Sequence, residues 1–596
     1  MPGSGRVTAT PLWFGPSDRP LFGWLHLPED GEVRGGVVLC QPLGIEAICV
    51  YFSYRLLAER LAGLGLAVLR FDYDGTGDSS GKETDPDRLE AWLDSAAAAT
   101  DLLACTGVGA IGLVGIRIGG LFAAHEAVRR GGVDALVLWD PNLSGKGFLR
   151  EQKFLRTLGL GADEGNGAAV EVPGIRFEAD TVKEFADLEL ATMEGPLADR
   201  TLVLVPPGRS RPRALQRRLE GLEVEWQEAT GQDLLLDSHL QEPPVDAIGR
   251  IADWLAGAVY AEPTTVARPI DSAVAVERTS LGRPVVERSV SLGPLGLFGI
   301  VTEGEVAPAT PTIVLVNEGN THHIGQSRIW VDLARRLATE GFRVLRFDLS
   351  GNGDSGTRPG QPAHVARAPE ATDDVNQAIG AISADDPGDV VLIGFCSGAY
   401  QIAEQAIDLR PRGVCVINPS FSFVPPEAVG THPRPARQAT KPWFVHLVRT
   451  PLKLAARRVG PEERDRWLNA LDIGTWPVAF SIRWPSVPSP VWRLVNRFVL
   501  DNTGVATLEH IVDDGVDTLL VCGPGDLLPV SLGAEHRVHR LEASEHFRLV
   551  VLDELDHSSW KLSQRNQMIE VVNGYLLDRY RPAPTARPSD LTNHRS

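Results

Sequence analysis

The chain has 596 residues, of which 43% are hydrophobic, and its formal net charge is −19. A chain of this length exceeds what one hydrophobic core usually supports, so we expect two domains. The negative charge repels phosphate backbones and anionic lipid surfaces, which argues against nucleic acid as a partner. Because the sequence shows neither a basic start followed by an apolar run nor a stretch of about 18 apolar residues, we expect no membrane span and a cytoplasmic location.

A repeated segment divides the chain. Residues 65–81 read GLAVLRFDYDGTGDSSG, and residues 341–356 read GFRVLRFDLSGNGDSG. Each copy continues with an amphipathic segment, a short apolar run, a glycine-flanked turn, a second amphipathic segment and another apolar run. Alternating buried strands and amphipathic helices predict a mostly parallel sheet with helices on both faces. The predicted fold class is therefore α/β, with two tandem, doubly wound domains.

The domain boundaries follow from the repeat and from composition. A segment with proline breaks and no sustained hydrophobic period separates the copies and is interpreted as a linker. The predicted order is a first domain at 1–262, the linker at 263–282, a second domain at 283–581 and a disordered tail at 582–596. An insertion at about 420–510 is predicted to be a cap, since loops of this length inside compact domains are usually functional.

The predicted cap carries several tryptophans, among them Trp443 and Trp476. They could form the small core of the cap. They could instead line a substrate path, because large aromatic side chains supply apolar contact area at a cleft. Both interpretations stay open.

The second copy contains a strand-to-helix turn of the type that carries a nucleophile. The sequence Gly394-Phe395-Cys396-Ser397-Gly398 follows an apolar run and precedes an amphipathic segment. Small residues two positions before and after the nucleophile are required there, because the strained backbone leaves no room for side chains. Asp526 and His557 follow two later apolar runs, in the chain order nucleophile, acid, histidine. The five other cysteines are interpreted as structural or incidental. The pattern predicts a triad of Cys396, His557 and Asp526.

The whole chain resembles two fused α/β-hydrolase units, and its RFDxxGxGDS segments are similar to those of exosortase-system-associated hydrolases. Those relatives use serine where this chain has Cys396. Polyhydroxyalkanoate synthases and bile-acid acyltransferase-like enzymes resemble it at this one position, with cysteine in the same fold. The resemblance implies an oxyanion hole made by the backbone N–H of Ser397 and by one from Gly319 or Asn320.

The first copy departs from the pattern. Its turn keeps the glycines but has Arg117 at the nucleophile position, and an arginine stays protonated at any working pH. We expect a noncatalytic scaffold, or a site where Arg117 binds a carboxylate or phosphate, for example on a pantetheine arm. An internal salt bridge to Asp74, Asp140 or Glu46 is the alternative.

Two further histidines follow the predicted oxyanion loop. His322 and His323 either touch substrate there or are ordinary polar loop residues. The glycine-rich turns are interpreted as nucleophile turns and strand ends rather than as a dinucleotide-binding GxGxxG or a Walker loop, and the histidine clusters match no metal-site spacing closely, so neither a cofactor nor a metal is expected.

Three functions stay open. One is an acyltransferase or condensing enzyme that takes an acyl group from a small-molecule donor, such as a CoA or carrier-protein thioester, and passes it to an amine or alcohol. Another is a thioesterase or esterase with water as acceptor. The last is a ligand-binding pseudoenzyme. A homodimer also stays open.

Overall fold

The computed structural model describes residues 6–159, 168–231, 242–267, 273–365, 370–383, 386–419, 503–531, 535–557, 559 and 561–581. The chain divides into two compact units. Unit 1 comprises Met1–Leu315, Thr321–His364 and Ser558–Ser596, and unit 2 comprises Val316–Asn320 and Val365–His557. Most of the predicted cap, including Trp443 and Trp476, and the predicted tail lie outside the described residues.

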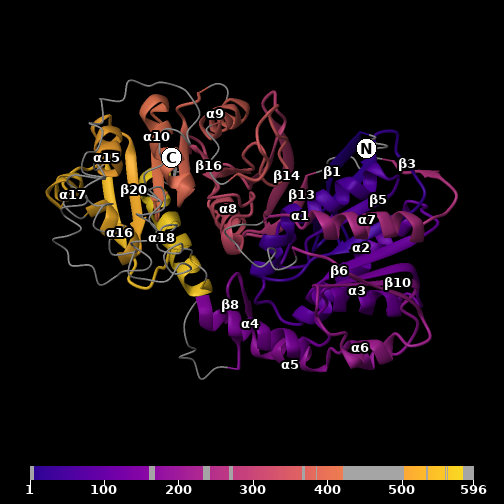
Figure 1. The fold of residues 1–596 in the computed structure, drawn as a ribbon. Coiled ribbons are helices and arrows are strands. Elements are labelled where there is room, and N and C mark those ends of the chain that lie inside the picture. Colours follow the sequence, from indigo (N-terminus) through magenta and orange to yellow (C-terminus); the bar gives the residue numbers. More distant parts are fainter. Residues whose placement is uncertain are drawn as a thin grey trace, which may run out of the picture. The chain divides into compact units, whose positions relative to one another are not determined.

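The N-terminal copy of the repeat forms an eight-stranded sheet in unit 1 (Figure 1). Its order is β1-β2-β5-β4-β6-β7-β10-β11, with β1, β2 and β5 pairing antiparallel and the rest parallel. The strands are β1 Val7–Phe14, β2 Leu21–Pro28, β4 Gly36–Cys40, β5 Ala67–Phe71, β6 Ile111–Ile116, β7 Val133–Trp139, β10 Ala198–Val205 and β11 Glu223–Glu228.

Helices cover both faces of this sheet because its central strands are apolar on both sides. In β4, Val37 and Leu39 pack with α1 and α7, whereas Val38 and Cys40 pack with α2 and α3. The larger helices of this copy are α1 Ile45–Gly63, α2 Arg88–Cys105, α3 Ile118–Arg129, α4 Gly145–Gly159, α5 Ala179–Asp187, α6 Arg213–Arg218 and α7 Val245–Ala258. The short elements are β3 Glu32–Val33, β8 Val170–Val172, β9 Ile175–Phe177, η1 Leu190–Thr192 and β12 Thr264–Thr265.

Unit 1 also contains the first part and the last helix of the second copy. Strands β14 and β15 pair antiparallel, β15 pairs antiparallel with β17, and β17 pairs parallel with β16. Helix α8 packs on β17 and β15, and α18 packs on α8. The elements are β13 Val274–Arg278, β14 Pro284–Leu292, β15 Leu297–Glu303, β16 Thr312–Val316, η3 Gln326–Arg328, α8 Ile329–Thr339, β17 Arg343–Phe347 and α18 Leu562–Tyr580.

Unit 2 holds four parallel strands in the order β18-β19-β20-β21. Strands β18 and β19 are buried throughout, as expected for central strands of a parallel sheet. The elements are α9 Ala371–Ile382, β18 Val390–Phe395, α10 Ser397–Leu409, β19 Gly413–Ile417, α15 Thr503–Asp513, β20 Asp517–Cys522, α16 Pro524–Ser531, α17 Glu535–Glu542 and β21 Phe547–Val551.

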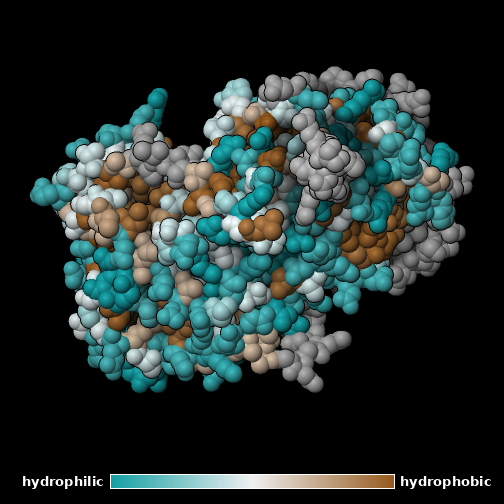
Figure 2. All heavy atoms as spheres, turned by 180° about the vertical axis from the view of Figure 1, so that it is seen from behind, coloured by the Kyte–Doolittle hydropathy of each residue, from teal (hydrophilic) through white to brown (hydrophobic). Residues whose placement is uncertain are grey.

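Hydrophilic residues predominate on the face drawn in Figure 2, with hydrophobic residues in separate groups between them. Among the described helices, none combines the length and the apolar character that crossing a bilayer requires.

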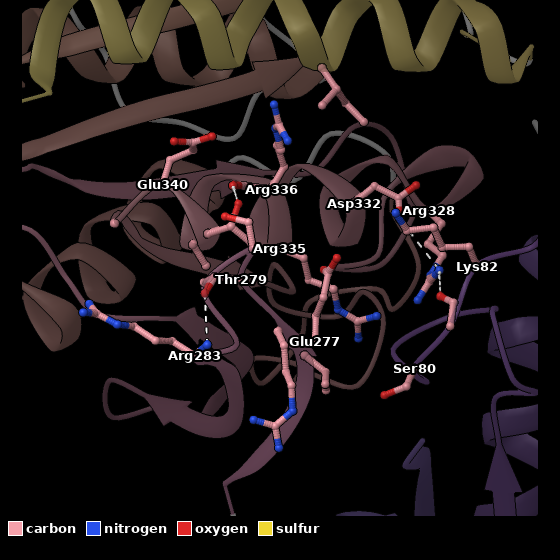
Figure 3. Close-up of a pocket in the computed structure, with 18 of the residues that line it drawn as sticks. Ser80, Lys82, Glu277, Thr279, Arg283, Arg328, Asp332, Arg335, Arg336 and Glu340 are labelled. Carbon is pink, nitrogen blue, oxygen red and sulfur yellow. Dashed lines mark hydrogen bonds and ion pairs between the residues drawn. The ribbon is translucent and has the colours of Figure 1, made fainter. Parts of the chain in front are cut away.

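Unit 1 has a hollow of about 1300 Å³ beside α8 (Figure 3). Arg328, Arg335 and Arg336 reach it from η3 and α8, and Thr279 and Arg283 reach it from the turn between β13 and β14. Acidic and basic side chains alternate in its lining, so the hollow shows no net preference for one sign of charge.

Candidate active site

Cys396 lies on a strained turn between β18 and α10. Its φ of 52° and ψ of −114° are rare for a residue with a side chain, and the surrounding structure must hold it there. Part of that restraint is the backbone N–H of Cys396, which donates to the carbonyl of Ile417 at 2.9 Å. The turn lifts the thiol out of the sheet and leaves it partly exposed.

The two flanking glycines are required by close backbone approach. A Cβ atom on Gly394 would lie 2.5 Å from the carbonyl oxygen of Gly398. A Cβ atom on Gly398 would lie 2.5 Å from the carbonyl oxygens of Val316 and Asn317. No side chain fits at these distances, which is why the local sequence reads glycine on both sides of the cysteine.

The structure brings the three predicted catalytic residues together within unit 2. Sγ of Cys396 lies 3.2 Å from Nε2 of His557, and Nδ1 of His557 lies 2.6 Å from Oδ1 of Asp526. Asp526 comes from the first turn of α16, just after β20, and His557 comes from the segment after β21. The neighbouring parallel strands deliver their carboxyl ends, and the segments that follow them, to the same edge of the sheet.

The neighbours of His557 favour the protonated form of its imidazole. Burial lowers the pKa of His557, but its hydrogen bonds to Asp526 and Cys396 outweigh burial and raise the pKa to about 10. Cys396 is also the N-cap of α10, where the helix dipole favours negative charge. At neutral pH the arrangement therefore suits a nucleophilic sulfur next to a proton-carrying histidine.

Two of the residues proposed for the oxyanion hole touch each other. The N–H of Gly319 donates to Oγ of Ser397 at 2.7 Å. In this structure the Gly319 donor is therefore engaged by a hydroxyl. A substrate oxyanion would have to displace that hydroxyl from Gly319, or use the N–H groups of Ser397 and Asn320.

Asn418 is a further residue of this site, and the sequence pattern did not predict it. Lying at the end of β19 and fully buried, it accepts a hydrogen bond from the N–H of Gly523 at 2.9 Å and donates to the carbonyl of Asp556 at 2.9 Å. One side chain thus bridges the segments that carry Asp526 and His557. The only available signal was a polar residue directly after an apolar strand.

We expect Asn418→Asp to weaken this bridge. The carboxylate keeps an acceptor for Gly523 but has no N–H for the Asp556 carbonyl, and two oxygens would then face each other in a buried place. Loss of such a bond costs on the order of 1–3 kcal/mol. Urea unfolding should detect a lower free energy of unfolding, together with slower acylation of Cys396. Unchanged values of both would contradict the bridging role.

The corresponding turn of the first copy has nearly the same backbone shape, with an arginine in place of the cysteine. Arg117 has φ 53° and ψ −123°, close to the values of Cys396. Its guanidinium lies 3.6 Å from Glu46 and 3.5 Å from Asp140, and it contacts Glu151 directly. The side chain is buried, and it lies among carboxylates of its own domain. A role of Arg117 in substrate binding stays a prediction.

His322 and His323 are both buried in unit 1. Nδ1 of His323 lies 3.0 Å from Asp348, and Nε2 lies 2.7 Å from Asp78. Burial lowers the pKa of His323, but the two carboxylates outweigh burial and raise the pKa to about 10. His322 stacks on Tyr51, with ring centroids 3.7 Å apart, and burial lowers its pKa to about 3. Both ring nitrogens of His323 are occupied by protein groups.

The His323 ion pairs predict a dependence of stability on pH. The folded pKa of about 10 lies above the unfolded value of about 6.5, so the contribution is complete below pH 6.5 and is lost as pH rises towards 10. The free energy of unfolding of the wild type minus that of His323→Gln should fall over this range, by up to about 1.4 kcal/mol per pH unit. A difference that stays constant from pH 6 to 10 would contradict the charged state.

Within the described ranges, no group of three or more histidine, cysteine, aspartate or glutamate side chains could hold a metal ion.

Two family models match the sequence, one on each copy of the repeat. The model of the alpha/beta hydrolase family matches residues 313–569, and that of serine aminopeptidase, S33, matches residues 35–160. The chain contains two tandem domains of the α/β-hydrolase fold. This confirms the predicted fold class, with mostly parallel sheets in both copies. The matches support an enzyme of the hydrolase type.

Solved structures give weaker likenesses. Est1E from Butyrivibrio proteoclasticus, solved with ferulic acid bound, is 18% identical, with 41% of this chain and 98% of that chain covered and a TM-score of 0.33. Proline iminopeptidase from Mycobacterium smegmatis is 16% identical, with coverages of 49% and 98% and a TM-score of 0.29. An esterase from Pyrococcus furiosus is 12% identical, with coverages of 51% and 93% and a TM-score of 0.29. Scores this low carry no argument about activity. No curated protein matches the sequence.

Proposed function

We propose that the protein forms an acyl-enzyme on Cys396 and transfers the acyl group to an acceptor. The observation that carries the proposal is the chain of contacts from sulfur to imidazole to carboxylate, 3.2 Å and 2.6 Å long. A thiolate attacks thioesters and other activated acyl groups well, so the preferred donor is a small-molecule or carrier-protein thioester.

The first half-reaction charges the cysteine. Sγ of Cys396 attacks the carbonyl carbon of the donor, and a new C–S bond forms. The oxyanion that develops is stabilised by backbone N–H groups, with Ser397 and the Gly319–Asn320 segment as candidates. When the intermediate collapses, the bond from carbon to the leaving thiolate breaks, and the His557 imidazolium gives that thiolate its proton.

The second half-reaction removes the acyl group from Cys396. The neutral His557 removes a proton from the acceptor, whose oxygen or nitrogen attacks the thioester carbon. The C–S bond to Cys396 then breaks, which restores the thiolate and the imidazolium. Asp526 holds the imidazole with Nε2 towards sulfur throughout both steps. An amine or alcohol acceptor makes the protein an acyltransferase.

Hydrolysis is the second candidate function, and the family models favour it. Both matched families are described as hydrolases or peptidases, in which water accepts the acyl group. The same triad serves either acceptor, and the two functions differ in whether the closed site excludes water from the acyl-enzyme.

The experiment that distinguishes acyl transfer from hydrolysis follows the fate of the acyl group. Purified protein is mixed with acyl-thioesters of several chain lengths, and intact and peptide masses are recorded with and without a panel of amines and alcohols. An adduct on Cys396 that becomes a new amide or ester supports transfer. An adduct lost only to water supports hydrolysis, and an adduct on another residue contradicts both.

A further inference from the structure

The two copies of the repeated turn bind each other reciprocally in unit 1. Arg346, in β17 of the second copy, pairs with Asp78 in the turn of the first copy at 2.5 Å. Arg70, in β5 of the first copy, pairs with Asp354 in the turn of the second copy at 2.6 Å. Arg70 and Arg346 are each the arginine of an RFD segment, and Asp78 and Asp354 are each the aspartate of a GDS segment.

All four side chains are at least 94% buried, so these are interior ion pairs and not surface contacts. Breaking such a pair leaves an uncompensated charge in a poorly solvated place. Within unit 1, the first copy and the first part of the second copy are therefore held together by the motif that they share. This gives the degenerate copy a structural reason to keep its turn.

The first copy also holds the second copy just after the predicted oxyanion loop. Asp78 binds Nε2 of His323 in addition to Arg346. Tyr51, on α1 of the first copy, stacks on His322 and lies under the guanidinium of Arg70 at 5.2 Å. Two consecutive residues of the second copy are thus fixed by side chains of the first.

The position of these two residues in the chain gives the contacts a functional meaning. Gly319 and Asn320, which carry the candidate oxyanion donors, precede His322 by only three and two residues, respectively. The other end of the same loop is fixed by β16, which ends at Val316. The loop is therefore short, and it is restrained at both ends.

We propose that Asp78 and Tyr51 of the noncatalytic copy are positioning residues for the oxyanion loop of the catalytic copy, acting through His323 and His322. The proposal rests on the proposed function. A short segment with one end held by β16 and the other by a buried ion pair and a ring stack has few conformations open to it. Preorganised N–H donors of this kind stabilise the developing oxyanion without reorganisation during the reaction.

The test uses two reactions of the same thiol in the full-length protein. Acylation by a thioester forms an oxyanion, whereas alkylation by iodoacetamide is a displacement at a saturated carbon and needs no oxyanion hole. In Asp78→Ala we expect the rate constant of acylation to fall about tenfold or more, because small displacements of donors have large effects on rate. The alkylation rate of Cys396 should stay within about twofold of the wild type, because the triad itself is intact.

Glu287→Ala is the matched control. Glu287 is buried in the same network, pairs with Arg346 and Arg335, and has no hydrogen bond to His323. Its removal should cost comparable stability and leave acylation near the wild-type rate. An equal loss of acylation in both variants would overturn the proposal, since a general destabilisation would then explain the effect.

A second pair of variants keeps the test usable where Asp78→Ala does not fold. Tyr51→Leu removes the ring stack on His322, and Tyr51→Phe keeps it. We expect slower acylation only in Tyr51→Leu. Equal rates in the two variants would overturn the role of the stack.

Hydrogen exchange separates failure of this proposal from failure of the proposed function. If Cys396 of the wild type reacts with iodoacetamide but is acylated by none of the donors, the proposed function fails. The restraint of the oxyanion loop by Asp78 can still be measured in that case. Asp78→Ala should then raise amide exchange in residues 317–323 more than Glu287→Ala does. Equal amide exchange of that segment in the two variants would overturn the proposal that Asp78 restrains the oxyanion loop.

Discussion

Replacing Cys396 with alanine should abolish the acyl adduct and lower turnover of thioesters by about 10⁶-fold, as removal of a nucleophile does in other triads. The sulfur is the nucleophilic atom that Nε2 of His557 contacts, so the substitution removes the group that His557 would activate. The measurement is intact mass after mixing with a thioester, together with the rate of thiol release. Urea unfolding should show a folded protein, since alanine fits the space of the partly exposed thiol.

Cys105 supplies the control for this substitution. It is an exposed free cysteine at the end of α2 in the other copy, and no catalytic group touches it. Cys105→Ala should keep both the adduct and the turnover. A persistent adduct in Cys396→Ala, or its loss in Cys105→Ala, would refute the assignment of the nucleophile.

Asp526→Asn should have the second largest effect. The amide keeps the size of the side chain but removes the charge that holds the His557 pKa near 10 and fixes the ring with Nε2 towards sulfur. By comparison with other triads the rate of acylation should fall by roughly 10³-fold to 10⁴-fold. Stopped-flow measurement of thiol release in a single turnover separates acylation of Cys396 from the later transfer of the acyl group to the acceptor.

The same variant predicts a change in how alkylation of Cys396 depends on pH. In the wild type, the change in rate with iodoacetamide that follows the charge of His557 should come near pH 10, because its hydrogen bonds to Asp526 and Cys396 outweigh burial and raise the pKa of that histidine to about 10. In Asp526→Asn the same change should move to lower pH, because the carboxylate that helps to raise this pKa is gone. Identical profiles would show that Asp526 does not act through His557.

The contacts between the two copies in unit 1 suggest a structural role for the first copy. Its own turn holds Arg117 among Glu46, Asp140 and Glu151, so the place of the nucleophile is filled by an internal ion cluster. Its retained RFDYDGTGDSSG segment does two other things. Asp72 accepts a bond from the N–H of Asp78 inside the turn, and Asp78 reaches the second copy.

Local rules explain what could be predicted from the sequence. A Cβ atom on Gly394 would meet the carbonyl of Gly398, and one on Gly398 would meet the carbonyls of Val316 and Asn317. Because this kind of turn always needs small residues at these two positions, the spacing around Cys396 alone indicated it. The order of nucleophile, acid and histidine follows from strands whose apolar runs are visible in the sequence. The two tandem α/β domains follow from the same periodicity, repeated twice.

What the sequence by itself determined was therefore the fold class, the turn that bears Cys396 and the candidates Asp526 and His557. The tertiary structure alone decided which distant groups meet. Asn418 bridges two segments more than 100 residues away, Gly319 donates to Ser397, and Asp78 binds a histidine 245 positions later. Side-chain partners across such separations depend on how strands and turns stack in space, and no short-range spacing in the chain records that arrangement.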